Sequence, residues 1–241
     1  ASAEAANYPF CTIEPNTGIV SVPDKRLFLL AELAESQKVI PAQMQFVDIA
    51  GLVSGASKGE GLGNKFLAHI REVDAILHVL RCFEDDDITH VENTIDPIRD
   101  AEIIETELML ADIESLERQM HNISKKARAN DKEAKADLLI MEELYKHLSD
   151  GTPIRLLNLP LEKVKRIKVF NMLSSKPLLY ACNVSEKDAA TGNNFSKLVF
   201  EKANKEQAEA VVISGSIESE IALLDDDEKS EFLKDLNLEE S

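Results

Sequence analysis

Asp48 and Gly51 form a D-x-x-G pattern where the apolar run "MQFVDIA" (44–50) ends. A carboxylate at a strand end can hold Mg²⁺, usually through water, and a glycine N–H can meet a terminal phosphate with no side chain in the way. Thr12, in an upstream loop, is the residue that could give the metal a second oxygen. We therefore predict a magnesium site at Thr12 and Asp48, with Gly51 beside the phosphate. A cap on the following helix is the alternative role for Asp48.

A second group of polar residues follows two later apolar runs, "PLLYACNV" (177–184) and "EAVVISGS" (209–216). An asparagine with a carboxylate three residues later can read the edge of a nucleobase, and a small S-G-S turn lets backbone N–H groups reach the same base. The predicted nucleotide-binding residues are Asn183, Val184, Glu186, Ser214, Gly215 and Ser216. Because ligands bind beyond the carboxyl ends of parallel strands, we expect these residues and Asp48 to share one cleft. A bond within its own loop is the alternative role for Asn183.

Five of the nine glycines lie in the stretch "DIAGLVSGASKGEGLGNKF" (48–66). Glycine is the residue that lets the backbone bend sharply or approach a ligand closely. Because Asp48 and Gly51 stand at the start of this stretch, we predict that residues 51–63 form a switch loop that becomes ordered when nucleotide is bound. An ordinary flexible surface loop is the alternative.

Short apolar runs alternate with helical patterns along most of the chain. The runs lie at 17–22, 44–50, 75–83, 177–184 and 209–216, and the helical patterns lie at about 25–36, 62–74, 194–206 and 217–235. The middle runs are continuously apolar, which is typical of strands in a parallel sheet that is covered on both faces. The alternation predicts an α/β fold with a doubly wound, mostly parallel sheet. His78 lies inside one of these runs, so we expect its role to be structural.

The stretch 97–148 breaks this alternation because it contains neither a glycine nor a strand pattern. Its apolar residues step by four and three, as in a coiled coil. They are Met109, Ile113, Leu116, Met120, Ile123 and Ala127 in the first series and Ala134, Leu138, Met141, Tyr145 and Leu148 in the second. A polar segment separates the two series, which predicts an antiparallel helical hairpin, with a further amphipathic helix at 160–173. We therefore expect a nucleotide-binding domain formed by residues 1–98 and 172–241, interrupted by a coiled-coil insertion at 99–171.

The net charge of −17 is unevenly distributed along the chain. Residues 118–135, around the expected hairpin tip, hold six basic residues against two acidic ones. The basic residues are Arg118, Lys125, Lys126, Arg128, Lys132 and Lys135. An acidic protein should not coat nucleic acid indiscriminately, but basic charge at the end of a long projection favours docking on ribosomal RNA. An ordinary solvated helix face is the alternative.

The cysteines indicate a reducing compartment. Cys11, Cys82 and Cys182 form no C-x-x-C pair, which argues against a disulfide framework or a zinc site. The sequence also contains neither a signal-peptide pattern nor an apolar run of bilayer length. We therefore expect a cytoplasmic protein with no membrane partner and no disulfide-linked partner.

Four segments together resemble the YchF/Obg-like ATPases, a family of P-loop proteins related to translation factors. The segments are "NYPFCTIEPNTG" (7–18), "FVDIAGLVSGASKGEGLGNKF" (46–66), "RCFEDDDITHV" (81–91) and "SEIALLDDDEKSEFL" (219–233). The resemblance extends over essentially the whole chain. It implies a Ras-like α/β domain with an inserted coiled coil, a C-terminal TGS domain, slow hydrolysis of ATP or GTP with Mg²⁺, and association with ribosomes.

Two parts of that family pattern are missing from the sequence. There is no G-x-x-x-x-G-K-[ST] phosphate loop, since "GEGLGNKF" has neither the spacing nor the hydroxyl. The chain also stops before any TGS domain. We therefore expect a fragment in which phosphate binding is impaired. The alternative function is that of an inactive nucleotide-domain fragment, which presents its coiled coil as a binding module.

Two further departures bear on the chemistry. Val184 and Glu186 replace the Lys and Asp of the N-K-x-D motif of related GTPases. The longer carboxylate should fit the guanine edge poorly, so we expect ATP to bind at least as well as GTP.

Leu52 stands where Ras-like GTPases carry a glutamine that orients the attacking water. Another group must then act in hydrolysis, and His90, which matches a loop histidine of the family, is the catalytic candidate; a solvated loop histidine is the alternative.

Overall fold

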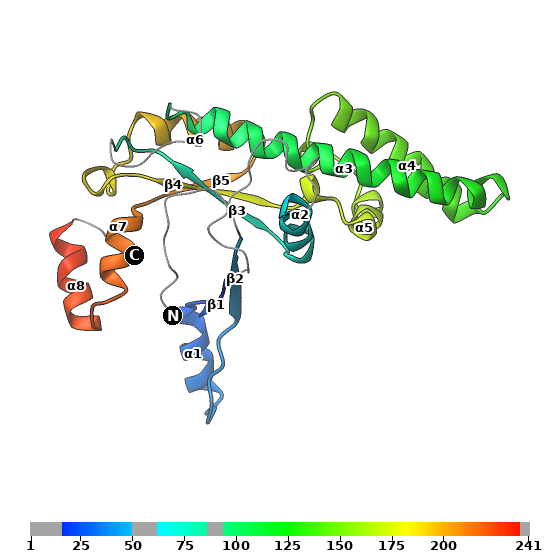
Figure 1. Ribbon diagram of the computed structural model, residues 1–241. Helices are drawn as coiled ribbons and strands as arrows, with labels where there is room; N and C mark the ends of the chain where they lie inside the picture. Colours follow the sequence, from blue (N-terminus) through cyan, green and yellow to red (C-terminus); the bar gives the residue numbers. More distant parts are fainter. Residues whose placement is uncertain (1–15, 50–61, 86–93, 237–241) are drawn as a thin grey trace. The chain divides into compact units, whose positions relative to one another are not determined.

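The chain divides into two compact units, Ala1–Leu52 and Val53–Ser241. The computed structural model describes residues 16–49, 62–85 and 94–236 (Figure 1). Across these described ranges, no helix is both long enough and apolar enough to cross a membrane.

The first unit is a two-stranded antiparallel ribbon with a helix in its connection. Strands β1 (Asn16–Ser21) and β2 (Gln43–Asp48) pair along their whole length, and α1 (Lys25–Leu33) lies between them in the sequence. The side chain of Asp24 accepts a hydrogen bond from the N–H of Arg26 at 2.9 Å, so Asp24 begins α1 as its N-cap. All three elements lie close to their expected positions.

The second unit contains a three-stranded parallel sheet in the order β3-β4-β5. Its strands are β3 (Ile76–Arg81), β4 (Leu178–Asn183) and β5 (Glu209–Ile213). Parallel strands need a long connection between them, and the connection from β3 to β4 holds the helical hairpin. The parallel pairing confirms the predicted fold class.

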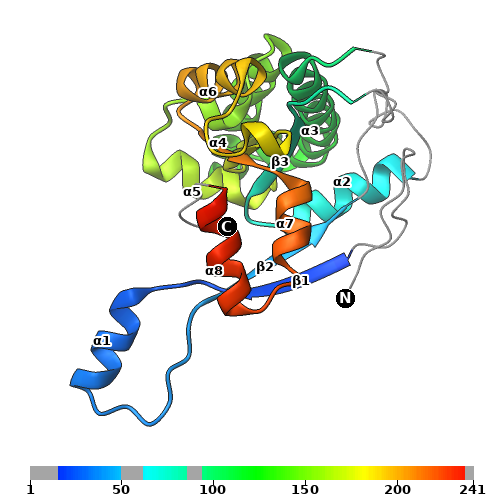
Figure 2. The same ribbon diagram turned by 90° about the vertical axis from the view of Figure 1, so that its left-hand side faces the viewer.

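Helix α3 (Pro97–Arg128) and helix α6 (Asn194–Glu206) cover one face of this sheet, as Figures 1 and 2 show. The buried core on that face consists of Leu80, Cys82, Ala101, Tyr180, Cys182, Val184, Val199 and Ala203. On the other face, the side chains of Leu77, Val79 and Val211 are 43%, 55% and 41% exposed. The apolar runs predicted two covered faces, and within the described part of this unit the second face stays partly open.

Helix α2 (Leu62–Glu72) precedes β3 and is attached to the segment that enters β4. The ammonium group of Lys176 donates to the backbone carbonyl of Arg71 at 3.1 Å and to that of Val73. These carbonyls lie at the carboxyl end of α2, where the helix dipole favours a positive charge.

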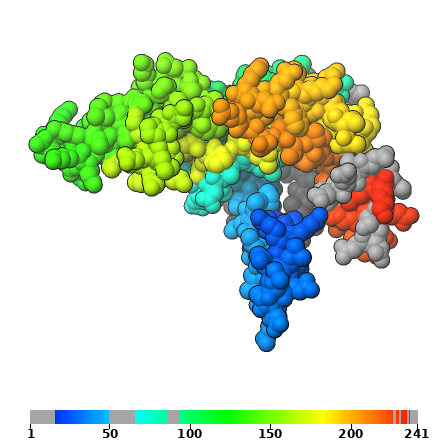
Figure 3. Space-filling view, turned by 180° about the vertical axis from the view of Figure 1, so that it is seen from behind, coloured from blue at the N-terminus to red at the C-terminus, as the bar shows by residue number. Residues whose placement is uncertain are grey.

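The second half of α3 forms an antiparallel hairpin with α4 (Lys132–Ser149), and this hairpin projects beyond α6 (Figure 3). Every apolar residue of the two predicted four-three series is buried or half-buried. Asp131 begins α4 because its side chain accepts hydrogen bonds from the N–H groups of Glu133 and Ala134, at 3.0 and 3.1 Å. The spacing pattern therefore identified one packed face of each helix correctly.

A third helix, α5 (Leu161–Phe170), packs against the hairpin. Its buried residues Ile167 and Phe170 join the same apolar cluster as Ile140 and Leu144 of α4. These two α4 residues lie outside the predicted seam. They are buried because α4 packs against α5 as well as against α3.

Two short 3₁₀ helices, Ile154–Leu156 and Leu173–Ser175, precede and follow α5. The second is held by Asp112 of α3, whose carboxylate accepts from the N–H groups of Leu173 and Ser174, both at 2.8 Å. Asp112 is fully buried, and this burial raises the pKa of its carboxyl group.

The predicted helix at 217–235 is two helices, α7 (Gly215–Ile221) and α8 (Asp226–Asp235). A capping box formed by Asp225 and Glu228 starts α8 as a separate helix. The N–H of Glu228 donates to the Asp225 carboxylate at 3.0 Å, and the Glu228 carboxylate accepts from the N–H of Asp225 at 3.3 Å. The prediction of one helix was wrong. It was based on the spacing of apolar residues, and that spacing does not reveal where a polar residue such as Asp225 caps a new helix.

Candidate nucleotide-binding site

The N-x-x-E and S-G-S motifs meet at the carboxyl ends of β4 and β5. Asn183 ends β4, and its amide oxygen accepts a hydrogen bond from the N–H of Gly215 at 2.9 Å. The N–H of Val184 donates to the carbonyl of Ile213, also at 2.9 Å. Two motifs that are distant in the sequence are therefore fixed side by side at one edge of the sheet, as expected from strand topology.

The predicted residues of these motifs differ in exposure. The side chain of Val184 is buried in the core of the sheet, and Ser214 is buried as well. The hydroxyl groups of Ser214 and Ser216 lie 3.1 Å apart. Glu186 is exposed and lies on a 3₁₀ turn, Glu186–Asp188. Glu186 therefore has a side chain free to face a ligand, whereas the side chain of Val184 is directed into the protein.

Asp188, at the end of this turn, organises the loop after β4. Its carboxylate accepts a hydrogen bond from the hydroxyl of Ser185 and another from the amide of Asn193, each at 3.0 Å. These two bonds lower the pKa of Asp188, with the one from Asn193 contributing most. Neither Asp188 nor Asn193 was predicted from the sequence. Asn193 followed by Ser196 just before an amphipathic helix is the N-cap pattern that could have revealed one of them.

The metal and phosphate candidates are described only in part. Asp48 ends β2 opposite Asn16 of β1, and its carboxylate is exposed. Thr12, Gly51 and His90 lie outside the described residues. Asp48 belongs to the first unit and the N-x-x-E and S-G-S motifs belong to the second.

His78 lies on β3 and faces the ring of Tyr180 on β4, with 6.0 Å between the ring centroids. Desolvation by the surrounding protein lowers the pKa of His78 to about 4. The imidazole is therefore neutral at pH 7, which agrees with the structural role expected for it.

A buried ionic network fastens the base of the hairpin to the sheet. The guanidinium of Arg155, after α4, lies 2.9 Å from Glu105 of α3 and 2.9 Å from Glu206 of α6. Lys202 of α6 lies 3.5 Å from Glu105, and the hydroxyl of Tyr180 donates to both carboxylates. The network contains two acids and two bases, and this pairing offsets part of the cost of burying charged groups.

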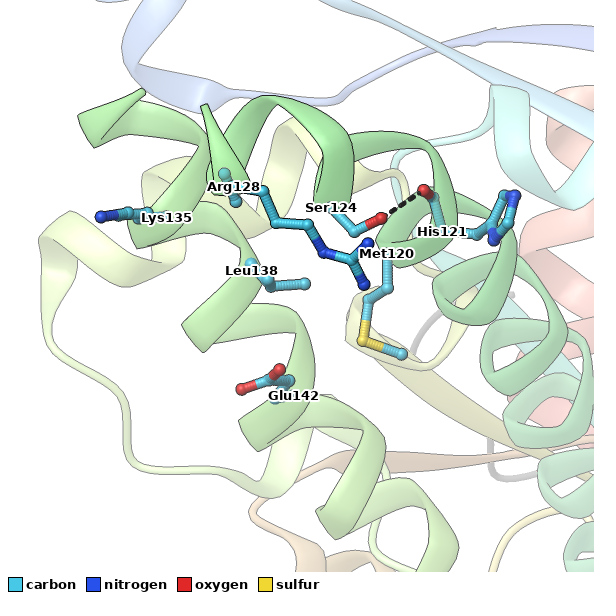
Figure 4. Close-up of a pocket in the computed structure, with 8 residues that line it drawn as sticks. Met120, His121, Ser124, Arg128, Lys135, Leu138 and Glu142 are labelled. Carbon is cyan, nitrogen blue, oxygen red and sulfur yellow. Dashed lines mark hydrogen bonds between the residues drawn. The ribbon is translucent and has the colours of Figure 1, made fainter. Parts of the chain in front are cut away.

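The hairpin tip carries the basic surface predicted from the sequence. All six of its basic residues are exposed, namely Arg118, Lys125, Lys126, Arg128, Lys132 and Lys135. An open cavity of about 550 Å³ lies between α3 and α4 at this end. Figure 4 shows the guanidinium of Arg128 directed toward Ser124 and Met120, while Lys135 points away from them. The tip thus presents several separate positive charges rather than one enclosed site.

A parallel sheet that brings the N-x-x-E and S-G-S motifs together at its carboxyl edge is typical of nucleotide-binding α/β domains. Residues 1–126 match the family model described as "50S ribosome-binding GTPase", which supports that class independently. The chain belongs to the YchF family, as the resemblance implied, and this follows from its close relatives.

Two curated relatives are both named "Ribosome-binding ATPase YchF". The protein from Haemophilus influenzae is 55% identical over 240 residues, and that from Bacillus subtilis is 50% identical over 243 residues. Each alignment covers 100% of this chain and 66% of the relative, so the chain spans 66% of their length. The solved structure of the Schizosaccharomyces pombe YchF GTPase superimposes with a TM-score of 0.79 at 36% identity, covering 98% of this chain and 65% of that one.

Proposed function

We propose that the chain is the nucleotide-binding core of an enzyme that hydrolyses ATP, and also GTP, to the diphosphate and phosphate. The enzyme acts as a nucleotide-controlled regulator on the ribosome. The observation that carries this proposal is the hydrogen bond from the N–H of Gly215 to the amide oxygen of Asn183, because it joins the two motifs that would hold the base.

The contacts of Asn183 favour a purine without selecting between adenine and guanine. Its amide oxygen is already bonded to Gly215, so its amide nitrogen is the group that can donate to a ligand. Atom N7 accepts hydrogen bonds in both adenine and guanine. Glu186 lies three residues later on an exposed turn, one methylene longer than the Asp of guanine-specific sites. We therefore expect ATP to bind at least as tightly as GTP.

Asp48 and Thr12 are the proposed magnesium ligands. The exposed carboxylate of Asp48 at the end of β2 suits a hard cation that keeps several of its waters. Bound Mg²⁺ would neutralise charge on the terminal phosphates. In this proposal Gly51 contacts the terminal phosphate through its N–H. His90 orients the attacking water, because the side chain of Leu52 cannot form hydrogen bonds.

The helical hairpin is the proposed docking element. In this assignment residues 1–98 and 172–241 bind the nucleotide, and residues 99–171 form a coiled-coil insertion that contacts ribosomal RNA. Six exposed basic residues at the tip of an otherwise acidic protein support it, since phosphate binding depends on such charges. The relatives named for ribosome binding support it as well. A ribosome-bound role places the protein in the cytoplasm.

Equilibrium binding and turnover with ATP and GTP test the proposal, each with Mg²⁺ and with a chelator. We expect both nucleotides to bind and to be hydrolysed slowly, with ATP at least as good as GTP and with turnover lost on chelation. Strong selectivity for GTP would contradict the proposed base site. Ribosome binding without any nucleotide binding would instead indicate a binding module.

A further inference from the structure

Both ends of the loop from Asn183 to Asn193 are hydrogen-bonded to the backbone of one residue, Cys82. The N–H of Cys82, just after β3, donates to the carbonyl of Asn183 at 2.7 Å. The carbonyl of the same residue accepts from the side-chain amide of Asn193, also at 2.7 Å. Cys82 is completely buried, so this anchor belongs to the core of the sheet. The beginning and the end of the loop are therefore both held by the backbone of Cys82.

Asn193 also anchors the loop to α6. Its side-chain oxygen accepts from the N–H of Ser196 at 3.1 Å, and its own N–H donates to the hydroxyl of Ser196 at 2.8 Å. This capping box starts the helix. Gly192 precedes it with φ +67°, and a Cβ there would lie 2.5 Å from the Ser196 hydroxyl oxygen, so the close approach requires glycine.

Asp188 connects this anchor to the turn that carries Glu186. A single carboxylate oxygen, Oδ2, accepts from both the amide of Asn193 and the hydroxyl of Ser185, at 3.0 Å each. The carbonyl of Asp188 accepts from the N–H of Gly192 at 2.7 Å. Asp188 thus holds both the residue before Glu186 and the segment that returns to the helix.

We propose that Asp188 and Asn193 are positioning residues that hold Glu186 and Asn183 in place for the base of a purine nucleoside triphosphate. This inference rests on the proposed function. Glu186 is exposed and its turn is short, so the order of the turn depends on these tethers. A binding group that is already ordered does not have to be immobilised when the ligand arrives, which strengthens binding.

Asp188→Ala tests the proposal, with Mg-ATP and Mg-tripolyphosphate as probes. Tripolyphosphate has no base, so a loop that serves the base should not affect its binding. We expect the variant to bind ATP about tenfold more weakly, from the loss of two hydrogen bonds to a charged group. Tripolyphosphate affinity should change less than about twofold.

Two further variants separate positioning from general destabilisation. Asp188→Asn can place its amide oxygen where Oδ2 accepts both bonds, so it should recover most of the ATP affinity. Asp131→Ala removes two comparable hydrogen bonds at the N-cap of α4, and its ATP affinity should be unchanged. The proposal is overturned if Asp188→Ala binds ATP normally, if it loses affinity equally for tripolyphosphate, or if Asp188→Asn loses as much as Asp188→Ala. Failure of the unsubstituted protein to bind ATP would instead refute the proposed function.

Discussion

The N–H of Gly215 donates to the amide oxygen of Asn183 at 2.9 Å, although 32 positions separate them in the sequence. The register of the sheet explains this contact. Asn183 is paired with Ile213, so β4 and β5 end at the same level and the turn after β5 passes over the end of β4. The contact therefore follows from parallel pairing with level strand ends, and it places the N-x-x-E and S-G-S motifs together.

Asn183→Ala should weaken the binding of ATP and GTP by a similar factor, about tenfold, because it removes a donor to an atom that both bases share. Isothermal titration with each nucleotide measures this. Asp131→Ala, at the N-cap of α4, is the control, and its affinity for both nucleotides should be unchanged. Unchanged affinity in Asn183→Ala would place the base elsewhere.

Arg155→Met should lower the free energy of unfolding by about 3 kcal/mol, because it leaves Glu105 and Glu206 short of a buried counter-charge. Urea titration measures the change. Lys163→Met breaks a much more exposed ion pair with Glu143 and should cost less than about 1 kcal/mol. Equal losses in the two variants would show that the buried network does not fasten the hairpin base.

His78 should make the protein less stable in acid. Its pKa is lowered from 6.5 to about 4 in the folded state, so between these values the unfolded chain binds a proton that the folded protein does not. Stability contributed by neutral His78 is complete above pH 6.5 and is lost as the pH falls toward 4. Between pH 7 and pH 5 this amounts to about 2 kcal/mol. His78→Phe should remove that part of the pH dependence in urea titrations, and an unchanged dependence would contradict it.

Lys125→Glu combined with Lys126→Glu should weaken ribosome binding, since it reverses two exposed charges at the hairpin tip. Co-sedimentation with ribosomes at low and moderate salt measures the effect, which should be largest at low salt. Lys197→Glu combined with Lys205→Glu makes the same change in net charge on exposed positions of α6 and should have little effect. If both double variants behave alike, the tip is not the docking surface.

The periodicity of apolar residues predicted the elements of the fold well. The strands could be located because they form short apolar runs between polar or turn residues, and the long hairpin because its apolar residues recur at alternating steps of four and three. The meeting of Asn183 with Gly215 was foreseeable from the topology alone, since the ends of parallel strands share one edge.

Polar residues account for most of what the sequence did not reveal. One buried face of α3 has steps of four, three and four and consists of Ala101, Glu105, Leu108 and Asp112. A search for apolar residues alone does not find this face, because two of its four residues are acids. Their burial is possible only because partners distant in the sequence, such as Arg155 and Ser174, neutralise or hydrogen-bond them. The role of Asp188 depends likewise on where Asn193 lies after folding.

The backbone amide signals of Gly215 and Ser216, followed by NMR during titration of the labelled protein, test the central claim most directly. We predict that Mg-ATP shifts both signals, because the base binds against the turn that Gly215 and Asn183 form, and that Mg-tripolyphosphate leaves them unchanged. Saturation with ATP that shifts neither signal would contradict the account.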